Sequence, residues 1–137
     1  MPETPQISGD DIRKWVETEI AQQIATVETA IKQFFADYVE GYKDHERGSK
    51  DQILFPRIRR RATTASLEWF KLRKRGQHVR IARGPRWSYP DAKFHNAAEY
   101  QRDAISEFEV NVLAPTRRRL ARLNEVLQSL RMFEQDQ

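Results

Sequence analysis

Positively charged side chains are concentrated in one stretch of this chain. Residues 47–86 contain thirteen Lys and Arg but only two acids, Asp51 and Glu68, so the stretch carries a formal charge of +11. The first 46 residues sum to −6 and the last 51 to −1, which leaves the whole chain at +4. A block of such density repels itself unless something acidic lies against it. We therefore predict that these side chains contact the phosphates of a nucleic acid.

The candidate binding residues form three groups along this block. Lysine and arginine neutralise phosphates, and arginine can also contact guanine in the major groove of B-DNA. The first group is Arg59, Arg60 and Arg61; the second is Lys71, Arg73, Lys74, Arg75 and Arg80; the third is Arg83 and Arg86. The alternative for all three groups is a solvated basic surface that binds nothing in particular.

Other residue types offer little support for catalysis. The three histidines, His45, His78 and His95, lie in separate segments, and there is no cysteine. Neither the spacing of metal ligands nor a glycine loop that would cradle phosphates is present. We therefore predict no enzyme activity, no metal site and no cofactor.

Two further sets of residues are open to more than one interpretation. Trp69, Trp87 and Tyr89 could stack on bases, although such aromatic residues more often belong to the core. Arginines 117, 118, 119 and 122 lie in one C-terminal segment. We expect most of them to pair with acids of the N-terminal helix, because consecutive helical positions point in different directions.

The elements that must position the basic block are two long helices. Apolar residues recur at helical spacing over 10–44 and again over 96–134, where Pro115 predicts a kink. Residues 1–8 are polar and rich in proline, and we expect a disordered arm. Residues 47–62 show no clear period and are expected to form a loop or a short helix.

Between the helices, residues 65–82 have the composition of a β-hairpin. Residues 65–73 are rich in aromatic side chains, and residues 77–82 alternate polar and apolar. A tight turn at Arg75-Gly76 would place Leu72 opposite Val79 and Phe70 opposite Ile81. Lys71, Arg73, His78 and Arg80 would then share the other face, which we expect to meet the ligand.

The predicted fold is a single α+β domain over 1–137, mainly helical, with two long antiparallel helices and an inserted basic β-hairpin. A seam of apolar residues at steps of four and three runs from Ile20 to Tyr38, and it predicts a homodimer of coiled-coil type. No signal peptide or stretch long enough to span a membrane is evident, so we expect a cytoplasmic protein with no membrane partner.

Several short motifs resemble the MobI-like family of conjugative transfer proteins. They are Glu68-Trp69-Phe70, the stretch Arg83-Gly84-Pro85-Arg86-Trp87-Ser88-Tyr89-Pro90, and then Phe94 and Glu99. The resemblance covers about residues 65–130. It implies an auxiliary mobilisation protein that binds the origin of transfer of a plasmid or integrative element and helps a relaxase to nick there. It assigns no catalytic residues.

Three hypotheses follow for the function. The first is double-stranded DNA binding at an origin of transfer. The second is a protein-interaction adaptor with a helical dimer seam and a basic docking surface. The third is binding to RNA or to single-stranded DNA.

Overall fold

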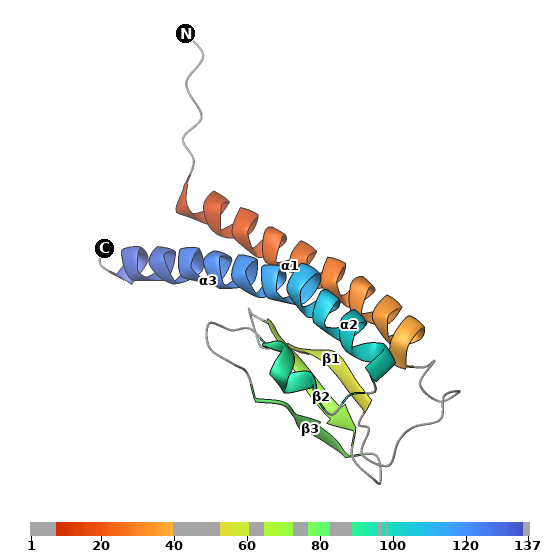
Figure 1. Ribbon diagram of the computed structural model, residues 1–137. Coiled ribbons are helices and arrows are strands. Elements are labelled where there is room, and N and C mark those ends of the chain that lie inside the picture. Colours follow the sequence, from red (N-terminus) through yellow and green to blue (C-terminus); the bar gives the residue numbers. More distant parts are fainter. Residues whose placement is uncertain are drawn as a thin grey trace.

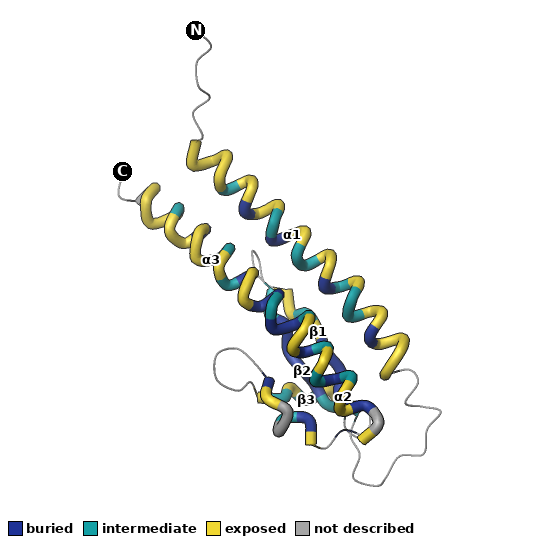
Figure 2. The backbone as a smooth tube through the Cα atoms, turned by 45° about the horizontal axis from the view of Figure 1, so that its top comes forward, coloured by how far each residue is buried: buried dark blue, intermediate teal, exposed yellow. Residues whose placement is uncertain are grey.

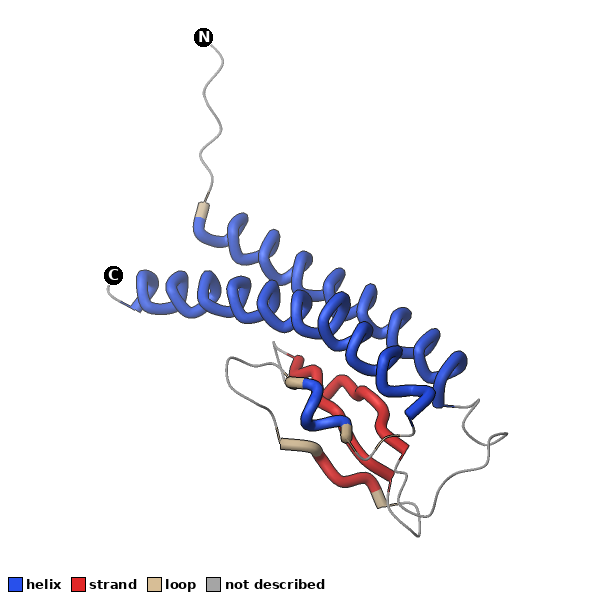
Figure 3. The backbone as a smooth tube through the Cα atoms, viewed as in Figure 1, coloured by secondary structure: helices blue, strands red, loops and turns tan. Residues whose placement is uncertain are grey.

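Two long helical segments lie side by side and antiparallel, and a three-stranded sheet packs against one side of them (Figure 1). The structure is a computed structural model, which describes residues 8–39, 53–60, 65–72, 77–82, 89–95, 97 and 99–135. The start of α1 and the end of α3 lie at one end of the helical pair, and the sheet lies toward the other end (Figure 3). The predicted α+β fold, mainly helical with a β-structure inserted between two long helices, is confirmed.

The first helix, α1 (Gly9–Phe34), begins at a capping box. The Ser8 hydroxyl accepts a hydrogen bond from the Asp11 backbone N–H, and the Asp11 carboxylate accepts one from the Ser8 backbone N–H. These contacts lower the pKa of Asp11, with the hydrogen bond from the Ser8 side chain as the largest cause. The helix continues as a π-helical turn, η1 (Phe35–Val39), and residues 40–44 of the predicted helix lie outside the described part.

The second helical segment passes Pro115 without ending. It consists of α2 (Glu99–Phe108), the π-helical turn η6 (Glu109–Leu113) and α3 (Ala114–Gln135). Pro115 has no backbone N–H, so it cannot donate the hydrogen bond that an α-helical residue makes to the carbonyl four residues earlier. The residue before it, Ala114, donates its N–H to the Glu109 carbonyl, which is five residues earlier, as in a π-helix. The helix therefore widens next to the proline. A short 3-10 helix, η5 (Asp91–Phe94), precedes α2.

The sheet contains one strand more than the hairpin that we predicted. Its order is β1 (Ile53–Arg60), β2 (Ala65–Leu72) and β3 (His78–Arg80), with both pairs antiparallel. The expectation of a loop or short helix over 47–62 is wrong for residues 53–60. Pro56 obscured the strand pattern, but proline is tolerated in β1 because β1 is an edge strand.

The register of the predicted hairpin is wrong by one residue. Phe70 lies opposite Arg80, and Lys71 lies opposite Val79. The predicted tight turn assumed only two residues between the strands, whereas 73–77 separate the observed ones. Since successive side chains in a strand point to opposite faces, this slip puts Lys71 on the face opposite to that of Arg80.

Buried residues form two clusters, to which both the helices and the strands contribute (Figure 2). The larger cluster surrounds Trp69, which contacts Phe34, Phe94 and Phe108. The smaller cluster joins α1 to α3 through Val16, Ile20, Leu120 and Leu127. The apolar seam of the first helix is therefore used within the chain, because Ile20, Val27 and Phe34 are all buried here. No helix in the described part is long and apolar enough to cross a membrane.

Candidate nucleic-acid interface

The face of the sheet that points away from the helices carries the candidate interface. Strand β1 contributes Phe55, Arg57 and Arg59 to this outer face, because their neighbours Leu54, Pro56 and Ile58 point toward the helices. The residues opposite them in β2 are Phe70, Glu68 and Ser66, and β3 adds His78 and Arg80. We call these eight residues the outer face.

A buried carboxylate organises two of its arginines. Arg59 Nη1 lies 3.5 Å from Glu68 Oε2, and Arg80 Nη1 lies 3.3 Å from Glu68 Oε1. The Glu68 side chain is only 3% exposed, whereas those of Arg59 and Arg80 are 49% and 55% exposed. One negative charge thus lies beneath two guanidinium groups, and each group keeps N–H donors available to solvent.

The third arginine of the outer face lies over an aromatic ring. The Arg57 guanidinium carbon is 5.3 Å from the centre of the Phe70 ring, and Arg57 Nη1 lies 3.2 Å from His78 Nδ1. Because arginine can only donate, Nδ1 of His78 is the acceptor in this contact. The outer face therefore holds three arginines against one acid, and its formal charge is +2 with His78 neutral.

The other predicted binding residues are placed differently or lie outside the described part. Arg60 points to the helix side of the sheet and pairs with Glu28 of α1. Lys71 is on the helix side as well and is half-buried. The remaining predicted binding residues lie outside the described residues: Arg61, Arg73, Lys74, Arg75, Arg83 and Arg86. Of the ten predicted positions, the structure thus brings Arg59 and Arg80 together on the outer face.

Sequence reasoning missed Arg57 and Glu68 as members of this site. The alternation Phe55-x-Arg57-x-Arg59 is a strand signal that places all three side chains on one face, but Pro56 interrupts it. Glu68 is a lone acid in a basic block, and nothing in the sequence shows that it lies between two arginines in space.

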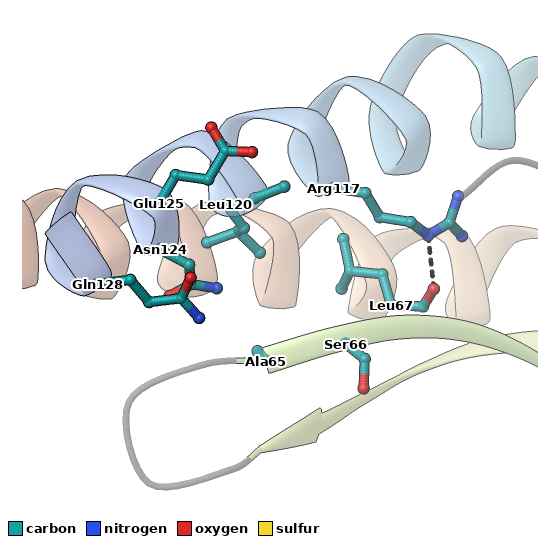
Figure 4. A pocket seen from close by; sticks show the side chains of 9 residues that line it. Ala65, Ser66, Leu67, Arg117, Leu120, Asn124, Glu125 and Gln128 are labelled. Carbon is teal, nitrogen blue, oxygen red and sulfur yellow. Dashed lines mark hydrogen bonds between the residues drawn. The ribbon is translucent and has the colours of Figure 1, made fainter. Parts of the chain in front are cut away.

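The sheet is fixed to the helices by a buried arginine. Arg117 of α3 donates from Nε to the Leu67 carbonyl at 2.6 Å (Figure 4). It also donates from Nη1 to Glu109 Oε2 at 2.7 Å. Glu109 also accepts a hydrogen bond from Trp69 Nε1 at 3.0 Å. We expected most of the four arginines of this segment to pair with acids of the first helix, but the acid that Arg117 meets lies two helical turns earlier in its own segment. Arg119 does reach the first helix, but it bonds there to Gln23.

A pocket of about 280 Å³ opens beside this arginine, between the start of β2 and α3 (Figure 4). Its lining includes the apolar residues Leu67, Leu120 and Ala121 and the polar residues Asn124 and Gln128. Because the pocket is on the helix side of the sheet, it is separate from the arginines of the outer face.

The described aromatic residues of the sheet, and Tyr89 after it, are not available for stacking on bases. Trp69 is fully buried, and Tyr89 is 3% exposed with its hydroxyl bonded to the Ile81 carbonyl. Trp87 lies outside the described part. On the outer face itself, Phe55 and Phe70 are only 6% and 8% exposed. These aromatic residues belong to the core. The groups of the outer face that a ligand can contact are therefore mainly the exposed guanidinium groups.

Comparison with known proteins identifies the family. The family model described as MobI protein matches residues 25–131, which is most of the chain and includes all three strands. The chain belongs to the MobI family. This membership indicates a role related to mobilisation, and it confirms the resemblance seen in the sequence. No match was found among curated proteins or among solved structures.

The described part of this MobI-family chain contains no cluster of three or more His, Cys, Asp or Glu side chains that could hold a metal ion. His78 contacts Phe55 edge-on at 4.9 Å between ring centres and also bonds to Arg57. Its ring is thus part of the outer face.

Proposed function

We propose that this MobI-family protein binds double-stranded DNA at an origin of transfer and assists a relaxase there. The observation that carries the proposal is the excess of arginine on the outer face of the sheet, where Arg57, Arg59 and Arg80 surround the single acid Glu68. Family membership supplies the context of mobilisation.

The burial of the aromatic residues of the sheet favours duplex over single-stranded DNA at this surface. Proteins that bind single strands stack bases on exposed aromatic rings, and those of Phe55, Phe70 and Trp69 are covered. Half-exposed arginines at the surface of a sheet suit the phosphates and the major groove of a duplex. Arg80, Arg59 and Arg57 are therefore the contacts that we assign to DNA.

Salt dependence tests the proposal. If each arginine neutralises one phosphate, the logarithm of the affinity falls with the logarithm of salt concentration by about 0.9 per contact. The double variant Arg57→Gln/Arg80→Gln keeps the pair of Arg59 with Glu68, so no buried carboxylate loses all its partners. We expect its slope to be shallower by about two units, with weaker binding at every salt concentration.

The control is Arg118→Gln/Arg122→Gln, which removes the same charge from two exposed positions of α3. Its slope should match that of the unmodified protein. Equal losses in the two double variants would show that binding follows overall charge or uses the helix, and that result would remove the outer face from the proposal. Stronger binding to single strands or RNA than to duplex would contradict the choice of ligand.

Assistance to a relaxase is tested separately. With purified relaxase and origin DNA, addition of the protein should raise the fraction of nicked DNA, and Arg57→Gln/Arg80→Gln should abolish the increase. If the variant stimulates nicking as well as the unmodified protein does, the assistance does not depend on this surface.

A further inference from the structure

Among the residues that the structure describes, none covers one side of the layer formed by the two helices. Helices α1 and α3 meet along Val16, Ile20, Leu120 and Leu127. The residue that follows a buried position faces the sheet. Glu28, after the buried Val27, pairs with Arg60 of β1. On α3, Ala121 and Gln128 each follow a buried leucine and line the pocket against β2. Because the helices are antiparallel and the sheet lies on one side of both, residues that precede the buried positions face the opposite side.

Large apolar side chains are exposed on that opposite side. Trp15 precedes Val16 and is 61% exposed, and Val126 precedes Leu127 and is 41% exposed. Ile12 is 36% exposed and Phe133 is 64% exposed. Arg13 and Glu134 form an ion pair between the two helices, and Ile12 and Phe133 each come one residue before a member of this pair. They therefore also lie on the side away from the sheet.

The ion pair between Arg13 and Glu134 joins the ends of the two helices, so Ile12, Trp15 and Phe133 gather at one level. We call Ile12, Trp15, Val126 and Phe133 the uncovered face. Single exposed apolar residues are ordinary, but a group that contains Trp and Phe on one side marks an interface.

The charges of the two helices indicate what covers this face. Residues 9–39 contain six acids and three bases, whereas α3 contains five bases and two acids. A second copy related by a two-fold axis parallel to the helices would place each α1 on the α3 of its partner, so that opposite charges meet twice. An axis perpendicular to the helices would instead place α1 on α1, and like charges would meet.

We propose that the uncovered face is a dimer interface, in which two copies form a four-helix bundle with α1 packed on the partner's α3. Trp15 of one copy then lies near Phe133 of the other, since both are at the same level of the helical pair. The two sheets lie on opposite outer sides of the bundle, at the end away from the termini. This interface replaces the predicted one from Ile20 to Tyr38, whose residues pack mainly within the chain.

The test is molar mass in solution, measured by light scattering over a range of protein concentrations. The unmodified protein should have twice the 16.2 kDa of one chain. Trp15→Glu/Phe133→Glu should raise the dissociation constant of the dimer by about a hundred-fold or more, because it places two charges in each copy where the proposed contact has its two largest apolar side chains. Val126→Glu should weaken the dimer in the same direction, and circular dichroism should show unchanged helix content because all three residues are exposed.

Met132→Glu is the matched control. Met132 is 67% exposed but lies about 100° further round the helix than Phe133, pointing away from α1. This variant should remain dimeric. A monomer for the unmodified protein at all concentrations, or equal disruption by Met132→Glu, would overturn the proposal.

Cross-linking tests the arrangement of the two copies, because the chain has no natural cysteine. Gln22 and Val126 lie at the same level to within about one residue in the register set by Arg13 and Glu134. When Gln22→Cys and Val126→Cys proteins are mixed with a short bis-maleimide, the mixed product should dominate. A dominant product between two copies of Gln22→Cys would show α1 against α1 and would overturn the proposed packing.

Discussion

Neutralising Glu68 should strengthen the dependence of DNA binding on salt. Its carboxylate lies within 3.3–3.5 Å of both Arg59 and Arg80, and it is the only acid on the outer face among the residues that the structure describes. Glu68→Gln keeps the shape of the side chain and removes its charge. One positive charge of Arg59 and Arg80 is then no longer balanced by a carboxylate of the protein, and it can neutralise a further phosphate.

The size of the effect follows from this charge count. The formal charge of the outer face rises from +2 to +3 in Glu68→Gln. One added phosphate contact steepens the slope of log affinity against log salt by about 0.9. Between about 50 and 200 mM salt, the variant should therefore lose about 3.5-fold more affinity than the unmodified protein loses over the same range.

Fluorescence anisotropy with a labelled duplex, repeated across a salt series, measures both slopes. Glu17→Gln is the control, because Glu17 is exposed on α1 and lies 11 residues, or about 16 Å along the helix, before Glu28, which pairs with Arg60 of β1. Its slope should not change. A slope for Glu68→Gln that equals or is shallower than that of the unmodified protein would refute the reasoning that Glu68 offsets charge at the DNA contact.

Three further predictions concern other parts of the structure. Arg117→Ala leaves Glu109 charged and buried, so the free energy of unfolding should fall by about 3–5 kcal/mol in chemical denaturation, while Arg118→Ala, at an exposed position, should change it by less than about 0.5 kcal/mol. Lys71→Gln should change the salt slope of DNA binding less than Arg80→Gln does, because Lys71 is on the helix side of the sheet; equal changes would contradict the observed register. The pKa of Asp11 is lowered in the folded state, so its contribution to the start of α1 is present above the unfolded pKa near 3.8 and is lost as pH falls through the lower folded value. Amide exchange in the first turn of α1 should accelerate over that acidic range, and Asp11→Asn should remove this pH dependence.

The periodic parts of the fold could be predicted from the sequence. Apolar residues at helical spacing located both long helices, and the aromatic content of residues 65–72 located β2. Strand β1 was missed because proline is rare inside strands. The strand can contain Pro56 because β1 lies at the edge of the sheet. That position is a property of the tertiary structure, so no local pattern reveals it.

The candidate site was only partly predictable for a similar reason. A basic block is visible in composition, but which face each side chain takes depends on register, and one residue of slip moved Lys71 to the other face. The pairing of Glu68 with Arg59 and Arg80 joins three strands, and Arg117 pairs with Glu109 at the start of the π-helical turn, eight residues earlier. Neither contact follows from spacing along the chain.

The location of bound DNA tests the central claim most directly. A duplex from an origin of transfer, substituted with 5-bromouracil, can be cross-linked to the protein by ultraviolet light, and the modified peptides can be identified by mass spectrometry. Our account predicts cross-links in peptides that contain residues 53–60 and 65–82, and their loss in Arg57→Gln/Arg80→Gln. Cross-links confined to α3 around Arg118 and Arg122 would contradict it.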